Sequence, residues 1–206
     1  MSADIIFVHG WGTGSAFWDR VRARLPEMQT VAIDLEFIGG GQSSCTAITR
    51  ESSIYITHSL GTMWALKNHH RSVKGLIAIN GFSCFQHFAD ERTLRAMKTR
   101  LQRTPEKQMQ NFWKTSGLPP SDDLNVQRLK EGLAWLSSWD VKEELKDLTC
   151  PILSLAGAED PILPLALMKE EWAGYDMPVC EGACHALPLS HPDWCAEHIK
   201  DFIREL

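Results

Sequence analysis

The chain has 206 residues, of which 44% are hydrophobic, and a formal net charge of −5. This length and composition suit one domain with a full hydrophobic core. The mildly negative charge disfavours a nucleic-acid partner, which would require a basic surface. No apolar run approaches the roughly 20 residues that span a bilayer, so we expect no membrane partner.

The first residues lack the pattern of a secretion signal. Met1 to Asp4 include an acid, and the apolar run Ile5–Val8 is too short for the hydrophobic part of a signal peptide. We therefore expect a cytoplasmic protein, and we expect it to be a monomer. Cysteines in that compartment are reduced thiols rather than disulfides. The sequence holds Cys45, Cys84, Cys150, Cys180, Cys184 and Cys195.

Cofactor and metal chemistry have little support in the sequence. It contains neither a dinucleotide-binding fingerprint nor a phosphate-binding P-loop, so we expect no cofactor. A cluster of cysteines and histidines near the C-terminus could be interpreted as metal ligands. Its spacing matches no common zinc pattern, and we expect no metal there. The cluster consists of Cys180, Cys184, His185, Cys195 and His198.

Short apolar segments alternate with segments of helical periodicity along the chain. The first helical pattern covers residues 17–25, the second residues 62–68 and the last residues 192–206. Runs typical of buried strands cover residues 5–8, 30–35, 54–57, 74–80, 151–156 and 177–180. This alternation predicts an α/β fold, with a mostly parallel sheet and helices on both faces.

Residues 85–148 interrupt the alternation and are called the helical insertion below. They contain no strand pattern, but they are charged, amphipathic and rich in Trp and Met, which favours three or four helices. We predict one domain overall, in which residues 1–84 and 149–206 form the core and the insertion forms a lid. At that position the insertion would lie above the strand ends, where α/β sheets bind their ligands.

The strongest local motif surrounds Ser59. An apolar strand ends at Thr57-His58, the serine follows, and Leu60-Gly61 opens a helix. This strand–turn–helix context is that of a nucleophile elbow, in which a tight turn exposes the serine hydroxyl. Small residues are needed two positions before and after the serine; Gly61 fits, whereas Thr57 replaces the usual glycine. Alternatively, the serine only caps the helix.

A glycine-rich turn follows the first strand at His9-Gly-Trp-Gly12. A loop at this place can direct a backbone N–H into the site. We therefore expect the amides of Trp11 and Leu60 to form an oxyanion hole. We expect His9 to organise the loop through hydrogen bonds rather than to act as a base. The alternative is an ordinary strand-to-helix turn.

Two later motifs supply an acid and a base. A strand runs into Gly157-Ala-Glu-Asp160, where Asp160 is the better candidate to orient a histidine and Glu159 is the fallback. His185 lies between the last predicted strand and the last helix. The chain order Ser59, Asp160, His185 is the order found in α/β-hydrolases. Together the motifs predict a serine hydrolase in which His185 is the general base.

Over nearly its whole length the chain resembles the α/β-hydrolase superfamily. Within it, the chain resembles BioH-type pimeloyl-acyl-carrier-protein methyl ester esterases of biotin synthesis. The resemblance rests on His9–Gly12 with Phe17-Trp18, His58–Gly61, Phe82–Phe85, Leu145–Leu148 with Cys150-Pro151, Gly157–Asp160, and Ala183–Ala186 with Ser190–Pro192. The segment 35–53, with Gly39–Gly41, is shorter than in such enzymes, which suggests that one covering helix is missing.

The resemblance implies an esterase that cleaves the methyl ester of a pimeloyl chain held on acyl carrier protein. It implies substrate contacts from Trp11, Phe112, Trp113 and Ser116. An acidic carrier needs a basic landing surface, and Arg95, Arg103 and Lys107 of the insertion are the candidates. The alternative is a solvated helix face of mixed charge. Phe88 and Trp135, like Phe112 and Trp113, either line an acyl channel or form the core of the insertion.

Two other functions fit the same motifs. One is a general short-chain carboxylesterase or thioesterase, which the triad alone does not separate from the methyl esterase. The other belongs to a different class, a non-catalytic binding protein that retains the hydrolase scaffold. The complete set of Ser59, Asp160 and His185 argues against the second.

Overall fold

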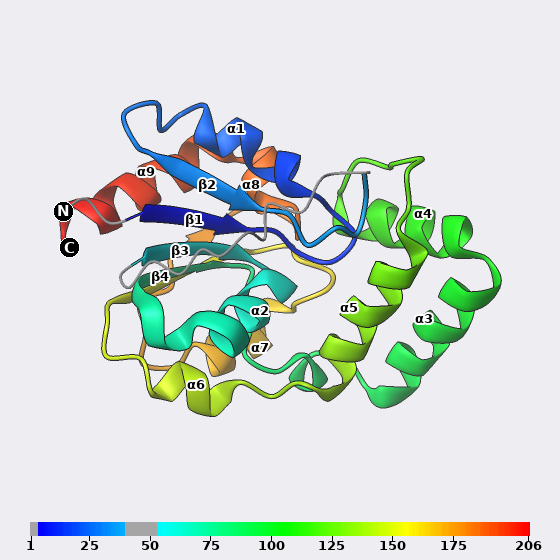
Figure 1. The fold of residues 1–206 in the computed structure, drawn as a ribbon. Coiled ribbons are helices and arrows are strands. Elements are labelled where there is room, and N and C mark those ends of the chain that lie inside the picture. Colours follow the sequence, from blue (N-terminus) through cyan, green and yellow to red (C-terminus); the bar gives the residue numbers. More distant parts are fainter. Residues whose placement is uncertain (1–3, 40–52) are drawn as a thin grey trace.

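The computed structural model describes residues 4–39 and 53–206 (Figure 1). Within these residues, six strands form one sheet in the order β2-β1-β3-β4-β5-β6, and all neighbouring pairs are parallel. The strands are β1 (Asp4–Val8), β2 (Thr30–Ile33), β3 (Ser53–His58), β4 (Val73–Ile79), β5 (Ile152–Gly157) and β6 (Val179–Cys180).

The core lies on both sides of the central strands. All six residues of β3 are buried, and so are the last five of β4. Such continuous burial requires helices on both faces. Figure 1 shows one face covered by α1 (Asp19–Arg22), α8 (Leu187–Ser190) and α9 (Pro192–Arg204), and the other by α2 (Leu60–His69), α6 (Lys142–Lys146) and α7 (Leu165–Glu171). The predicted parallel sheet with two covered faces is confirmed.

Three further helices of the insertion pack together beyond the C-terminal ends of the strands (Figure 1). They are α3 (Glu91–Arg103), α4 (Pro105–Ser116) and α5 (Val126–Ser138). The side chain of Asp90 caps α3 by accepting the amide of Thr93, and Gly117, with φ of 71°, ends α4 in the left-handed conformation. These helices therefore lie at the sheet edge where the predicted site residues converge.

Some element limits differ from those predicted. The second strand ends at Ile33 instead of continuing to residue 35, because the Asp34 carboxylate accepts the amides of Ser15 and Glu36 and turns the chain. The last strand is reduced to two residues after Pro178, which has no N–H to donate to a ladder. The predicted helix over 17–25 is a 3₁₀ turn (Ser15–Trp18) followed by α1. Most of the shortened segment 35–53 lies outside the described residues.

Candidate active site

Ser59 occupies the sharp turn between β3 and α2. Its backbone has φ of 53° and ψ of −125°, a strained conformation for a residue other than glycine, and its side chain is almost buried. Gly61 permits this turn, because a Cβ there would lie 2.4 Å from the carbonyl oxygen of Val8. No side chain fits that space, so the glycine lets α2 approach β1 closely and holds the serine at the sheet edge.

The structure accommodates Thr57, which departs from the usual motif, by bonding its hydroxyl inside the sheet. That hydroxyl donates to the carbonyl of Ile77 at 3.2 Å and lies 2.8 Å from the hydroxyl of Thr62. Because the Thr57 hydroxyl donates its own hydrogen to Ile77, it accepts a hydrogen bond from the Thr62 hydroxyl. A larger residue is therefore tolerated beneath the turn because both of its polar functions are satisfied.

The side chains of Ser59, His185 and Asp160 form a hydrogen-bonded row. The Nε2 atom of His185 lies 3.1 Å from Ser59 Oγ, and its Nδ1 atom lies 2.7 Å from Asp160 Oδ2. Asp160 is buried and accepts the amides of Ile162 and Leu163 through its other oxygen. An ionised Asp160 makes Nδ1 a donor, which leaves the lone pair of Nε2 free to accept the serine proton.

Glu159, the fallback acid, is exposed, and it is Asp160 that contacts His185. The geometry thus distinguishes between the two acids that the sequence motif offered. The three residues follow three different strands, and Ser59 and His185 are 126 positions apart in the chain. A hydroxyl with an adjacent imidazole and a carboxylate behind it can act as an activated nucleophile.

The loop of Trp11 lies beside this row. Leu60 opens α2, so its amide is one of the first-turn donors without a partner inside the helix. His9 fixes the loop: its Nε2 accepts the amide of Leu35 at 2.8 Å, and its Nδ1 contacts the carbonyl of Gly10 at 2.9 Å. The predicted organising role of His9 is confirmed, and the loop amide of Trp11 lies on a rigid turn.

Two tryptophans join this loop to the helical insertion. The indole N–H of Trp11 donates to the carbonyl of Leu129 in α5, and that of Trp113 in α4 donates to the carbonyl of Gly12 at 2.7 Å. Trp11 also packs edge-on against Phe112, with ring centroids 4.7 Å apart. These hydrogen bonds therefore join the insertion to the loop of residues 9–12.

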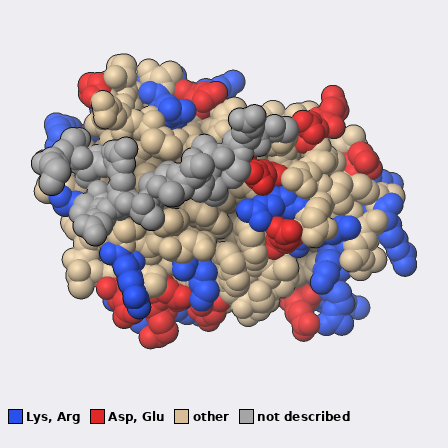
Figure 2. All heavy atoms as spheres, viewed as in Figure 1, with Lys and Arg blue, Asp and Glu red and all other residues tan. Residues whose placement is uncertain are grey.

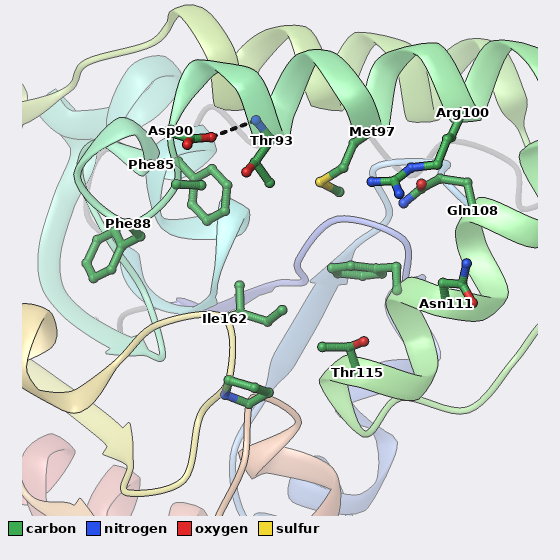
Figure 3. A pocket seen from close by; sticks show the side chains of 13 residues that line it. Phe85, Phe88, Asp90, Thr93, Met97, Arg100, Gln108, Asn111, Thr115 and Ile162 are labelled. Atoms are coloured by element: carbon green, nitrogen blue, oxygen red, sulfur yellow. Dashed lines mark hydrogen bonds between the residues drawn. The ribbon is translucent and has the colours of Figure 1, made fainter.

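A cavity of about 510 Å³ lies between α3, α4 and the turn that follows Asp160 (Figure 3). Figure 3 shows phenylalanines 85 and 88 at one end, Arg100, Gln108 and Asn111 at the other, and Met97 and Ile162 between them. Phe112 and Pro161 complete its wall with Ala89, Asp90, Thr93 and Thr115. The middle of the cavity is apolar, and polar side chains lie at both ends: Asp90 and Thr93 beside Phe85, and Arg100, Gln108 and Asn111 opposite them.

The predicted substrate contacts occupy different places relative to this cavity. Phe112 lines it, and Trp11 lies behind Phe112. Trp113 and Ser116 are buried elsewhere: Trp113 bonds to Gly12, and the Ser116 hydroxyl donates to the carbonyl of Phe112 at 2.8 Å. Both side chains are thus held by hydrogen bonds to backbone carbonyls. Gln108 and Asn111, which no sequence motif singles out, also line the cavity.

Asn80 is another residue that sequence reasoning missed. It directly follows β4, is fully buried, and has a positive φ of 44°. Its side chain contacts the end of β5 and the loop that carries His185. An asparagine directly after an apolar strand was the only signal for it in the sequence.

The predicted docking residues are exposed on the insertion. Arg95 pairs with Glu91 on the same helix, with 2.6 Å between charged atoms. Arg103 lies at the end of α3 and Lys107 in the first turn of α4. Figure 2 shows that basic and acidic side chains mix on the visible face of this part of the molecule. The surface is therefore basic in places rather than uniformly so.

No group of three or more His, Cys, Asp or Glu side chains in residues 4–39 and 53–206 is arranged to hold a metal ion. His185, a member of the cluster considered as metal ligands, instead bonds to Asp160 and Ser59. In the same part of the chain, no helix has the length and apolar character needed to cross a membrane.

Residues 5–198 match the model of the alpha/beta hydrolase family. The chain belongs to the alpha/beta hydrolase family. Solved structures of other alpha/beta hydrolase-like proteins share the fold: an esterase from Exiguobacterium antarcticum superimposes with a TM-score of 0.80, covering 98% of this chain and 92% of that one at 17% identity. An esterase from Thermogutta terrifontis gives a TM-score of 0.76, covering 100% and 90% at 17% identity.

Among curated proteins, this alpha/beta hydrolase is similar to pimeloyl-[acyl-carrier protein] methyl ester esterases. The protein of Yersinia enterocolitica is 23% identical, over 98% of this chain and 93% of its own length. That of Pectobacterium carotovorum is 25% identical, over 98% and 94% respectively. The family and these esterase relatives support an enzyme that hydrolyses carboxylic esters.

Proposed function

We propose that this hydrolase is a serine esterase that cleaves the methyl ester of pimeloyl-acyl-carrier protein. The observation that carries the proposal is the hydrogen-bonded row of Ser59, His185 and Asp160 at the strand ends. The two relatives described above carry the name of this activity, which supports the choice of substrate. A carrier-bound biosynthetic substrate also favours a cytoplasmic site of action.

In the proposed mechanism, Ser59 Oγ attacks the ester carbonyl while His185 Nε2 takes its proton. Asp160 stabilises the resulting imidazolium and holds the ring in the productive tautomer. The amides of Trp11 and Leu60 bind the negatively charged oxygen of the tetrahedral intermediate. Collapse of that intermediate breaks the bond to methoxide, which leaves as methanol with the proton from His185. Water, deprotonated by His185, then attacks the acyl-serine and releases the acid and the free serine.

The cavity supports a chain-like acyl substrate. Phe112 connects it to the Trp11 loop, and Ile162 connects it to Asp160, whose carboxylate accepts the Ile162 amide. Its apolar wall suits methylene groups, and the end lined by Arg100, Gln108 and Asn111 suits the polar group at the far end of the chain. We propose that α3 and α4 form the lid over the acyl chain, and that Phe112 contacts it directly.

We propose that a carrier protein approaches the enzyme on the side of the helical insertion. Arg103 and Lys107 are exposed near the end of the cavity that Arg100 lines. An acidic partner gains attraction from such positions even when the whole chain is net negative, because screening limits the reach of distant charges to about 8–10 Å at moderate salt. We propose that Arg95, Arg103 and Lys107 contribute to carrier docking.

The test begins with Ser59→Ala and a fluorophosphonate probe. The native chain should be labelled at Ser59, and the variant should lose several powers of ten in turnover of a p-nitrophenyl ester. Retention of most activity in Ser59→Ala would disprove the serine mechanism. Lack of labelling would favour a binding protein without turnover.

The substrate is tested separately. Pimeloyl methyl ester on carrier protein should be cleaved with a higher kcat/KM than matched free short esters and carrier-bound thioesters. Equal efficiency on free short esters would instead favour a general carboxylesterase, and faster thioester cleavage a thioesterase. Growth of a biotin auxotroph that lacks its methyl esterase, restored by the native gene and not by the Ser59→Ala form, would establish the role in cells.

A further inference from the structure

The main-chain carbonyl of His185 accepts two buried hydrogen bonds from residues at the ends of neighbouring strands. The Nε2 atom of His58 lies 2.9 Å from this oxygen, and the Nδ2 atom of Asn80 lies 3.0 Å from it. His58 is the last residue of β3, directly before Ser59, and Asn80 directly follows β4. Both side chains are buried. We call these two residues the carbonyl clamp.

Asn80 links the clamp to the strand that leads to the acid. Its Oδ1 accepts the amide of Gly157 at the end of β5, while its Nδ2 donates to the carbonyls of Cys184 and His185. One amide side chain thus joins the strand end before Asp160 to the loop of the base. Asparagine suits the position on two grounds: it offers a donor and an acceptor, and it tolerates the positive φ of 44° better than most residues.

His58 contributes through a single tautomer. Because Nε2 faces a carbonyl oxygen, it carries the proton, and Nδ1 is left as an acceptor that is buried without a partner among the described residues. A Cβ on Gly10 would lie 2.7 Å from that Nδ1, so the backbone of the Trp11 loop packs directly against the ring. The ring centroid of His58 lies 4.9 Å from that of His185. A neutral ring here adds no charge beside the base.

The loop that carries His185 lies between β6 and α8 and has little regular structure of its own. Its geometry must therefore be fixed by contacts with other segments. The amide of Glu159 donates to the carbonyl of Ala183, and the clamp fixes the next peptide groups along. Fixing the His185 carbonyl fixes its Cα–Cβ direction, on which the 3.1 Å distance from Nε2 to Ser59 Oγ depends.

We propose that His58 and Asn80 are positioning residues that hold the general base through its own main-chain carbonyl. This inference rests on the proposed serine mechanism. The clamp touches neither the reacting atoms nor the imidazole nitrogens of His185. Its effect on turnover is therefore predicted to be indirect, through the placement of Nε2.

The decisive experiment compares His58→Leu with His58→Gln. Leucine removes the donor, whereas glutamine can place an amide N–H close to the position of Nε2. We expect His58→Leu to lower kcat about tenfold with little change in KM, as for loss of one hydrogen bond at a reacting geometry, and His58→Gln to recover most of the activity. Rates are expressed per active site, counted by complete fluorophosphonate labelling. In Asn80→Asp, which retains Oδ1 but loses the donor, kcat should fall in the same way.

A second readout follows the base itself. The proton between His185 Nδ1 and Asp160 should give a low-field NMR resonance in the native protein and in His58→Gln. It should shift or broaden in His58→Leu and in Asn80→Asp. The control is Trp172→Phe, which removes a buried bond from the indole N–H to the carbonyl of Gly81, beside the clamp but without contact with His185. This control should lower the melting temperature and leave kcat and the resonance unchanged.

The outcomes are separable. If His58→Leu and Asn80→Asp are less stable but retain kcat per active site and the resonance, the two residues only support the fold and the inference is wrong. If Asn80→Asp does not fold, the pair of His58 variants decides alone. If Ser59→Ala retains esterase activity, the proposed function fails first, whatever the clamp variants do.

Discussion

The indole N–H of Trp11 donates to the carbonyl oxygen of Leu129 at 2.9 Å, joining residues 118 positions apart in the chain. Both groups are buried, and Gly132 on the next turn of α5 leaves room for the indole, since a Cβ there would lie 2.6 Å from it. The loop that we propose offers an amide to the oxyanion is thus tied to the helical insertion. This hydrogen bond therefore connects the insertion to the loop beside Ser59.

Trp11→Phe should therefore impair catalysis without touching the triad. The change leaves the Leu129 carbonyl unpaired and loosens the loop, so we expect kcat to fall about tenfold, in line with a lost buried hydrogen bond. Trp139→Phe, at the far end of α5, is the control and should retain native kcat. Steady-state kinetics on a p-nitrophenyl ester measures both. Equal kcat values for the two variants would mean that the insertion does not position the loop.

Asp160→Asn should abolish most of the activity while preserving the fold. The amide oxygen can still accept the amides of Ile162 and Leu163, but an uncharged group no longer stabilises the imidazolium of His185. We expect kcat to fall by about 10³ to 10⁴, as for other triads in which the acid is neutralised. The exposed neighbour provides the matched control: Glu159→Gln should leave kcat unchanged. A large loss in Glu159→Gln would mean that the acid has been misassigned.

Thr57→Gly should destabilise the protein, although it restores the residue usual at that position. The change removes the hydrogen bonds to Ile77 and Thr62 and adds backbone entropy to the unfolded chain. Together these effects should lower the free energy of unfolding by about 2 kcal/mol. Thr57→Ser retains the hydroxyl and should lose less. Urea denaturation of the three proteins tests this, and a glycine variant as stable as the native chain would contradict it.

Stability should decrease in mild acid because of His58. Burial lowers the pKa of His58 well below its ordinary value of 6.5, and the nearby His185 lowers it further. In mild acid, His58 is therefore protonated in the unfolded chain but stays neutral in the folded chain. Stability from this group is present above pH 6.5 and is lost below it, at up to about 1.4 kcal/mol per pH unit.

The matched variant is His58→Gln, which has no titratable group. Its free energy of unfolding should vary less between about pH 7.5 and about pH 5.5, by about 1 kcal/mol, in urea titrations. A residual dependence should persist, because burial also lowers the pKa of His69. Parallel pH curves for native and variant protein would show that His58 accepts its proton in the folded state.

Charge reversal at Arg103 and Lys107 should affect only carrier-borne substrate. Arg103→Glu combined with Lys107→Glu should raise KM for the carrier-bound ester about tenfold at low salt and less at high salt, since the effect is electrostatic. Turnover of a free methyl ester should not change. Lys142→Glu with Lys146→Glu, on α6, alters the charge equally elsewhere and is the control. If both double variants behave alike, general charge rather than a docking site governs the interaction.

The fold was predictable because its main determinants are local. Continuous apolar runs such as 54–57 have the signature of buried parallel strands, and each chemical motif directly follows such a run. The row of Ser59, Asp160 and His185 could therefore be expected from the order and position of the motifs alone. The sequence favours Asp160 over the adjacent Glu159, and in the structure Asp160 is buried against His185 while Glu159 is exposed.

Other features depend on contacts that no local pattern encodes. Asn80 bonds to Gly157 and to the loop of residue 185, both remote in sequence, and its positive φ gives no signal in the residue type beyond a general tolerance of asparagine. Trp113 and Phe112 are neighbours on α4, yet one bonds to Gly12 and the other lines the cavity. Helical periodicity does not determine which aromatic residue bonds to the Gly12 loop and which lines the cavity.

The backbone at Ser59 is held in a conformation that glycine would adopt without cost, whereas any other residue costs about 1–3 kcal/mol there. If Ser59 is the nucleophile, as we propose, the chain gives up folding stability here for a reactive hydroxyl. A descendant released from selection for turnover would gain stability by changing this serine to glycine. In such sequences, a glycine at position 59 beside an intact His185 and Asp160 would mark a hydrolase that has lost its chemistry and kept its scaffold.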